Sequence, residues 1–183
     1  MVAAGAFLLL RLQFIFTPTA LMVIGIIGAI TAIYGAIFAL NQFDLKKILA
    51  YSTVSQLGVM MMGFGSGSPN GTLLHLITHA FFKACLFIAA GVIIHSLHQA
   101  SAQHQRFDPQ DVRNMGGLRK LLPNVFIAFV LASCSLAGLP LFSGFLSKEA
   151  MLVNMVQQAM DTGMAFYWIM TVVFLLASLI TVL

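Results

Sequence analysis

Apolar stretches of about 20 residues, the length that crosses a bilayer as a helix, recur along this 183-residue chain. They restrict its fold more than any other feature. Hydrophobic residues make up 60% of the chain and charged residues only 8%, whereas about a quarter of an ordinary soluble domain is charged. A single soluble core cannot bury this much apolar surface. The sequence therefore predicts an all-α, polytopic transmembrane helix bundle that has the lipid bilayer as its surroundings.

The predicted membrane elements follow one another with short connections. The fifth is too long for a simple crossing and is expected to break near residues 138–144. The first is short and is interrupted by Arg11, and the last is still apolar where the sequence stops, which indicates a piece of a larger membrane protein. The predicted elements are 1–16, 19–40, 45–64, 71–96, 122–160 and 163–183.

Charge distribution predicts the orientation of the chain. The net charge is +4 without a long basic run, so we expect no nucleic-acid partner. Lys46 and Lys47 are separated by two predicted crossings from the basic loop 97–121, so both clusters fall on one face. Basic loops favour the cytoplasmic side, so we predict that 97–121 is a cytoplasmic loop. The histidines in and next to this loop fit no ligand spacing, and no metal site is predicted: His95, His98 and His104.

The segment HLITHAFFKACLF, residues 75–87, places protonatable groups inside an apolar helix. His75, His79 and Lys83 are spaced four apart, so they share one face and extend about 12 Å along the axis. A lysine at the bilayer centre costs at least about 2.5–3.5 kcal/mol, and such residues usually mark an ion or proton path. The alternatives are a lysine that reaches toward the headgroups and histidines that only join helices.

A second polar feature is SLAGLPLFSGFLSKEA, residues 135–150. Gly138, Pro140 and Gly144 interrupt an apolar run that resumes afterwards, and Lys148 follows them. Exposed backbone is not tolerated in lipid, so such a break must face protein or a water-filled cavity. We predict a broken helix with a buried lysine. The alternative is a simple proline kink with Lys148 at the membrane edge.

Polar side chains also interrupt the third predicted element, in LAYSTVSQLG, residues 49–58. They could hold water beside the lysine helix or form interhelical hydrogen bonds, and we favour the second interpretation slightly. Histidine titrates near neutral pH, and burial penalises the charged form of a lysine. Together, Lys83, Lys148, His75 and His79 therefore suit a path along which protons are taken up and released.

Longer motifs in a fixed order resemble a known family. FDLKKILAYSTVSQLGVM (43–60), HLITHAFFKACLFIAAGVIIHSLH (75–98), QDVRNMGGLRKLLP (110–123) and LAGLPLFSGFLSKE (136–149) resemble the antiporter-like proton-pumping subunits of respiratory complex I. The similarity is greatest to the distal subunit, called L in bacteria and 5 in mitochondria.

The resemblance implies a fold of two inverted repeats, of which this chain is the second, with one broken helix. It implies that Lys148 lies on the outward exit side and that His75, His79 and Lys83 lie on the preceding long helix. It further implies a fragment of NADH:quinone oxidoreductase that couples quinone reduction to proton pumping.

The resemblance also implies what surrounds the chain. The expected partners are other complex I membrane subunits, especially the neighbouring antiporter-like subunit, and the expected location is the bacterial inner membrane. We expect no cofactor in this chain, with NADH, FMN, iron–sulfur clusters and quinone on other subunits. The alternatives are a subunit of a multi-subunit sodium/proton antiporter or of a membrane-bound hydrogenase, and a scaffold that transports nothing.

Overall fold

The computed structural model describes the backbone of residues 3–104 and 108–182, and the side chains of 3–99 and 108–182. Within these ranges the chain is helical, apart from turns and an isolated bridge between Asp44 and Asp111. Residues 1 and 2 of the first predicted element, residue 183 of the last and residues 105–107 of the predicted loop lie outside the described residues. The helices are α1 Ala4–Arg11, η1 Gln13–Ile15, α2 Pro18–Leu40, α3 Leu45–Gly65, α4 Pro69–His104, η2 Val112–Asn114, α5 Leu118–Leu121, α6 Pro123–Ala137, α7 Ser143–Thr162 and α8 Ala165–Val182.

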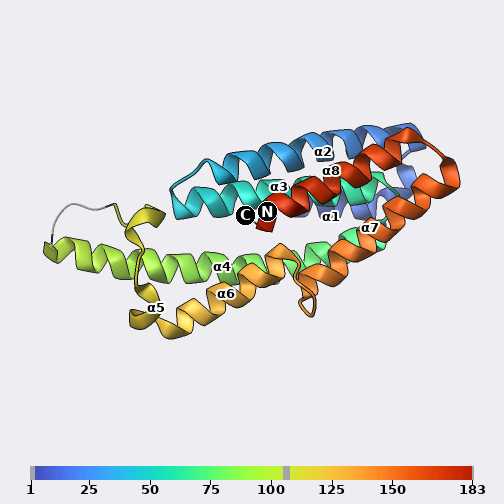
Figure 1. Ribbon diagram of the computed structural model, residues 1–183. Helices are drawn as coiled ribbons and strands as arrows, with labels where there is room; N and C mark the ends of the chain where they lie inside the picture. The colour runs from blue at the N-terminus through green and yellow to red at the C-terminus, as the bar shows by residue number, and fades with distance from the viewer. Residues whose placement is uncertain (1–2, 105–107, 183) are drawn as a thin grey trace.

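Helices long and apolar enough to cross a membrane occur at four places in the described part of the chain: Pro18–Leu40, Leu45–Gly65, Pro69–Gln99 and Ala165–Val182. α6 is apolar but shorter, with 15 residues. α6 and α7 follow one another with a short connection between them, and both pack against α4 (Figure 1). The predicted all-α polytopic membrane fold is confirmed.

Two elements differ from the predicted ranges. The first predicted element, 1–16, is the eight-residue helix α1 and a 3₁₀ turn. The helix cannot continue into α2, because the residue before Pro18 is extended and Thr17 caps the new helix by accepting a hydrogen bond from the Ala20 amide at 3.3 Å. In contrast, α4 continues past the predicted limit at residue 96 to His104, because this part of the sequence contains no glycine or proline to end a helix.

Small residues bring α2 and α3 into close contact. A Cβ atom added to Gly28 would lie 2.7 Å from the Gly58 carbonyl oxygen, and one added to Gly35 would lie 2.6 Å from the Ser55 amide nitrogen. Helices in membranes associate through such close backbone packing, because lipid gives no hydrophobic drive for them to associate. The pair is a rigid support for the polar residues of α3.

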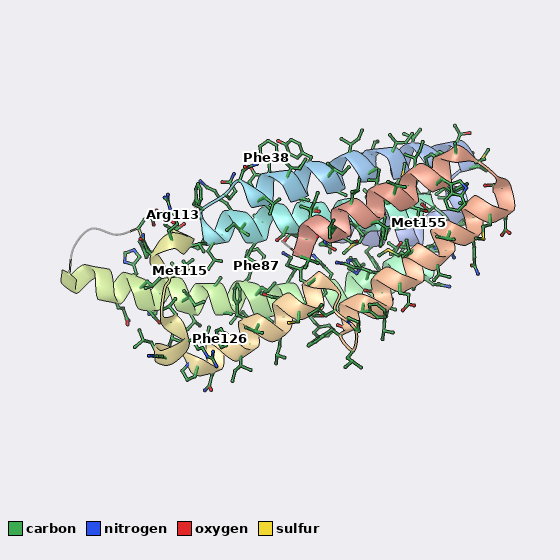
Figure 2. The ribbon with its side chains drawn as sticks, viewed as in Figure 1. Phe38, Phe87, Arg113, Met115, Phe126 and Met155 are labelled. Atoms are coloured by element: carbon green, nitrogen blue, oxygen red, sulfur yellow. The ribbon has the colours of Figure 1, made fainter. Side chains whose placement is uncertain are left out.

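α3 and α2 also pack together on methionines from α7 and α8. Met62, Met151, Met155 and Phe174 form a buried cluster, in which both α7 methionines are fully buried. Met155 is labelled in Figure 2, where α7 runs beside α8. This cluster fixes α7 against α3 and so determines where the first turns of α7 lie.

The segment after α4 returns to the start of α3. The Leu45 amide donates to the Gln110 carbonyl at 3.0 Å, and the Val112 amide donates to the Phe43 carbonyl at 2.9 Å. The Arg113 guanidinium lies 4.4 Å from the centre of the Phe43 ring, beside the turn between α2 and α3 (Figure 2). These contacts put Lys46 and the described part of the predicted basic loop at one end of the bundle.

Candidate functional site

The three protonatable residues of α4 lie on one buried face. His75, His79 and Lys83 are 0%, 4% and 5% exposed. The two imidazole rings are 6.0 Å apart between centroids. The Phe82 ring meets the His79 ring edge-on at 5.3 Å, so an apolar side chain covers the line from one side. The spacing predicted this shared face, and the structure turns the face toward α3 and α7.

Lys83 is held by α3. Its Nζ donates to the Leu49 carbonyl oxygen at 3.2 Å and to the Ser52 Oγ at 2.5 Å. Within residues 3–99 and 108–182 the only ion pair joins Arg113 to Asp111, so the structure shows no carboxylate bound to this ammonium. The described partners of Lys83 are uncharged oxygens. Such acceptors stabilise the ammonium, and no ion pair has to be broken when its proton leaves.

His75 joins three helices. Its Nδ1 lies 2.8 Å from the Ser147 Oγ of α7, and its Nε2 lies 3.0 Å from the Gln56 Oε1 of α3. The Gln56 and Ser147 side chains are both fully buried. His79 differs from His75, because its Nε2 is buried without a hydrogen-bond partner among the described residues. An unsatisfied buried nitrogen is costly, so this atom is a natural place for a water molecule to bind.

The break between α6 and α7 spans residues 138–142. Gly138 ends α6 in the left-handed region, with φ of 80°, and Pro140 lies in the connection two residues later. This pattern commonly terminates helices, because glycine tolerates positive φ and proline cannot continue the helix. Gly144 belongs to the first turn of α7, where an added Cβ would collide with the Ser135 carbonyl oxygen of α6.

Lys148 lies across this break from the end of α6. Its Nζ donates to the Leu136 carbonyl at 2.8 Å and to the Ala137 carbonyl at 3.4 Å. The last carbonyls of a helix have no intrahelical partner and form the negative end of the helix dipole. Lys148 is 7% exposed, so the structure places it inside the bundle, in contrast to the alternative of a lysine at the membrane edge.

A hollow of about 550 Å³ reaches the partners of both lysines. Leu49 and Ser52 from the Lys83 site line it, together with Leu136 and Ala137 from the Lys148 site. Its other polar side chains include Ser55 and Thr181. Because a water molecule takes about 30 Å³ of liquid volume, the hollow has room for several.

Comparison with known proteins decides the family. The family model described as NADH:quinone oxidoreductase/Mrp antiporter, TM matches residues 1–178. The chain belongs to this family.

Two relatives of this chain in the family are several times longer than the chain. This chain is 47% identical over 154 residues to NAD(P)H-quinone oxidoreductase subunit 5, organellar chromatophore 1, of Paulinella chromatophora, covering 83% of this chain and 23% of the relative. It is 42% identical over 184 residues to NADH-ubiquinone oxidoreductase chain 5 of Dugong dugon, covering 100% and 28%. The chain thus spans about a quarter of the length of these relatives. The expected resemblance to antiporter-like complex I subunits is confirmed.

The antiporter fold also matches a solved structure. The Mrp complex from Dietzia sp. DQ12-45-1b has a chain similar to this one with a TM-score of 0.68 and 27% identity, covering 90% of this chain and 29% of that chain. The family and the fold therefore agree with the arrangement of helices described above.

Sequence reasoning missed three side chains of this antiporter-family site. Ser52 and Gln56 form interhelical hydrogen bonds, as favoured for the polar residues of 49–58, but the sequence did not indicate that their partners are Lys83 and His75. Their spacing of four residues on α3 matches that of the α4 line and was the available signal. Ser147 carried only one signal, its position next to Lys148. Ser55 also forms an interhelical hydrogen bond, to α2, because it donates to the Ala32 carbonyl at 2.8 Å.

Proposed function

We propose that the chain is part of a proton-translocating membrane subunit of NADH:quinone oxidoreductase, in which quinone reduction is coupled to proton pumping. Family membership and the relatives named as chain or subunit 5 support this function. The observation that carries it is the row of buried polar side chains that begins at Lys83, passes His79 and His75, and reaches α7 at Ser147, the residue before Lys148.

The two lysines are the charge-storing groups of the proposed path. Each ammonium is bound only to uncharged oxygens in the described part of the chain, so either protonation state can be accommodated without separating an ion pair. A proton released from Lys83 Nζ passes to the free ring nitrogen of His79, through water where the gap is too long for a direct bond. His75 then receives it and contacts α7 through Ser147.

The broken helix supports the output side of the path. The α6 carbonyls that accept from Lys148 belong to a helix end that lies inside the bundle. Free helix ends of this kind interact with ions in membrane transporters. Lys148 therefore serves as the terminal group of the described line, and the hollow of about 550 Å³ reaches the two α6 residues whose carbonyls it binds.

The remaining assignments follow from the same proposal. The enzyme is the whole oxidoreductase, and we place its NADH, FMN, iron–sulfur and quinone sites on other subunits, with none in this chain. Other membrane subunits, foremost a neighbouring antiporter-like subunit, are its proposed partners. We place it in a bacterial inner membrane, an assignment supported by the cyanobacterial relatives from Picosynechococcus and Synechocystis.

A subunit of a sodium/proton antiporter is the second candidate. The structural similarity to a chain of the Mrp complex, and the family description that names both groups, favour it. Measuring transport in sodium-free and sodium-containing vesicles separates the candidates. Proton transfer driven by NADH oxidation without sodium supports the oxidoreductase, whereas exchange that requires sodium supports the antiporter.

Replacing Lys148 tests the proposed function directly. We expect Lys148→Ala in the complete complex to lower proton pumping, measured by dye quenching in vesicles, by roughly the 100-fold that general acid–base groups contribute. Coupled quinone reduction should fall with it while the complex stays assembled. Lys46→Ala, at an exposed lysine of the same chain, is the control and should pump normally. Normal pumping by an assembled Lys148→Ala complex contradicts the assignment.

A further inference from the structure

The hydrogen bonds around His75 determine which of its nitrogens carries hydrogen. The Thr181 hydroxyl of α8 donates to the Ala177 carbonyl at 2.7 Å, so its single hydrogen is used within its own helix. The Thr181 oxygen is left as an acceptor and receives the Gln56 Nε2–H at 3.2 Å. The amide nitrogen of Gln56 therefore faces α8, and its carbonyl oxygen faces His75.

This orientation fixes the imidazole. An amide oxygen can only accept a hydrogen bond, so the 3.0 Å contact between Gln56 Oε1 and His75 Nε2 requires a hydrogen on Nε2. We propose that Gln56 is a positioning residue that holds neutral His75 in the Nε2–H tautomer. Nδ1, which faces Ser147, is then the atom that gains and loses a proton. This inference rests on the proposed function only where it treats His75 as part of a proton path.

The Ser147 hydroxyl satisfies both protonation states of His75. When the ring is neutral, the hydroxyl donates to Nδ1 across 2.8 Å. When the ring is charged, Nδ1–H donates to the Ser147 oxygen, and the hydroxyl hydrogen turns to the Gly144 carbonyl at 3.2 Å. Thr78 Oγ1 lies 3.4 Å from the Ser147 Oγ, but the Leu74 carbonyl at 3.0 Å is the closer acceptor for its single hydrogen.

The proton transfer balances at the serine. In the direction of the proposed path, the imidazolium gives its Nδ1 proton to Ser147 Oγ, while the hydroxyl hydrogen that points to Gly144 leaves to a water molecule on the α7 side. The serine is unchanged and the imidazolium has become a neutral imidazole. The titratable groups near this step are His79 on α4, 6.0 Å away between ring centroids, and Lys148, the residue after Ser147 on α7. α3 contributes the uncharged Gln56, and α8 contributes Thr181.

The alternative acceptor ties the histidine to the helix break. Gly144 lies in the first turn of α7, and in an α-helix its carbonyl also accepts the backbone N–H of Lys148. Gly144 is packed directly against Ser135 at the end of α6. Protonation of His75 therefore changes a hydrogen bond at the turn that carries the second lysine.

Nitrogen-15 NMR of histidine-labelled protein in lipid bilayers tests this inference, with the His75 signals identified by their loss in His75→Gln. We expect protonated Nε2 and unprotonated Nδ1 in the neutral wild-type ring. Gln56→Met keeps the side-chain length but removes the acceptor, so the Nδ1–H form should increase several-fold. Gln56→Glu keeps an oxygen acceptor and should preserve Nε2–H.

Ser55→Ala is the matched control, because Ser55 is the buried neighbour of Gln56 that binds α2. It should leave the tautomer unchanged. An Nδ1–H wild-type ring, or an unchanged tautomer ratio in Gln56→Met, overturns the inference. If Gln56→Met does not fold, an Nδ1–H ring in the wild type still overturns the inference. The tautomer is read without any pumping assay, so failure of the proposed function and failure of this inference are distinguished.

Discussion

The two buried lysines are bound in different ways. Lys83 lies within the continuous helix α4 and depends on the Ser52 hydroxyl and one carbonyl of the neighbouring helix α3. Lys148 follows a broken helix and, within the part of the chain that the structure describes, is bound only by backbone carbonyls at the end of α6. In an unbroken helix most carbonyls are already used, so a side chain must supply an acceptor, whereas a broken helix exposes carbonyls for that purpose. The Lys83 site is therefore sensitive to one side chain, and the Lys148 site is sensitive to the geometry of the break.

Gly144→Ala should have the largest effect, because it changes that geometry. The added Cβ collides with the Ser135 carbonyl, and overpacking of this kind costs about 1–3 kcal/mol. We expect α7 to move away from α6, Lys148 to lose its acceptors, and both pumping and the yield of assembled complex to fall. Gly91→Ala is the control, since an added Cβ there meets nothing within 4 Å. Equal assembly and pumping in the two variants contradicts the role assigned to the break.

Lys83→Ala comes next. We expect it to reduce dye-quench pumping more than His75→Ala or His79→Ala does singly, because water can replace one histidine in a relay but cannot replace the charge-storing group. All three side chains are buried at 5% exposure or less, so their removal creates comparable cavities. If the three variants pump equally after matched assembly, the graded path along α4 is wrong.

Ser52→Ala has a smaller effect and separates the two lysine sites. It removes one acceptor of Lys83, and hydrogen bonds to charged groups contribute about 1.5–3 kcal/mol. Pumping should fall several-fold, with the Lys148 site unchanged. Ser55→Ala removes a buried hydroxyl of the same helix that binds α2, so it should leave pumping near normal. A larger loss in Ser55→Ala than in Ser52→Ala would show that helix packing, and not the lysine, sets the rate.

The sequence predicted the parts of this comparison that depend on spacing along one chain. The shared face of His75, His79 and Lys83 follows from helical periodicity, and the interruption at Gly138 and Pro140 follows from backbone stereochemistry. The structure adds that Gly144 lies inside α7, where it allows close packing against Ser135.

Partners contributed by other helices could not be predicted in this way. The link between His75 and Ser147 joins residues 72 positions apart, and the link between Gln56 and Thr181 joins residues 125 positions apart. Such pairs depend on how α3, α4, α7 and α8 pack, which local propensity does not specify. A polar residue on a membrane helix is equally suited to binding a lysine, a histidine or a backbone carbonyl until its neighbours are known.

The smallest expected effect concerns the end of the bundle where α3 begins. A substitution there tests whether the Lys83 site depends on how the start of α3 is held. The Arg113 side chain donates hydrogen bonds to the Asp111 carboxyl. These bonds, together with the positive charge of Arg113, hold the pKa of Asp111 below its usual value. A lowered pKa means that this contact stabilises the fold above the carboxyl's unfolded pKa and loses that contribution as the pH falls through the folded one. The backbone of Asp111 forms an isolated β-bridge with the backbone of Asp44. The Asp44 side chain caps α3 by accepting a hydrogen bond from the Lys46 amide at 2.8 Å.

Arg113→Gln should therefore raise the Asp111 pKa toward its ordinary value, as read by NMR titration of the carboxyl. The start of α3 should loosen slightly, and pumping should fall by less than in Ser52→Ala, because Leu49 and Ser52 lie one and two turns further along the helix. Among the described residues no hydrogen bond joins Lys148 to this anchor, so the Lys148 site should not respond. Lys120→Gln, at an exposed basic residue nearby, controls for loss of surface charge. If Arg113→Gln leaves the Asp111 pKa unchanged, the Arg113 hydrogen bonds do not govern this carboxyl, and the start of α3 is held by its backbone bonds and the Asp44 cap.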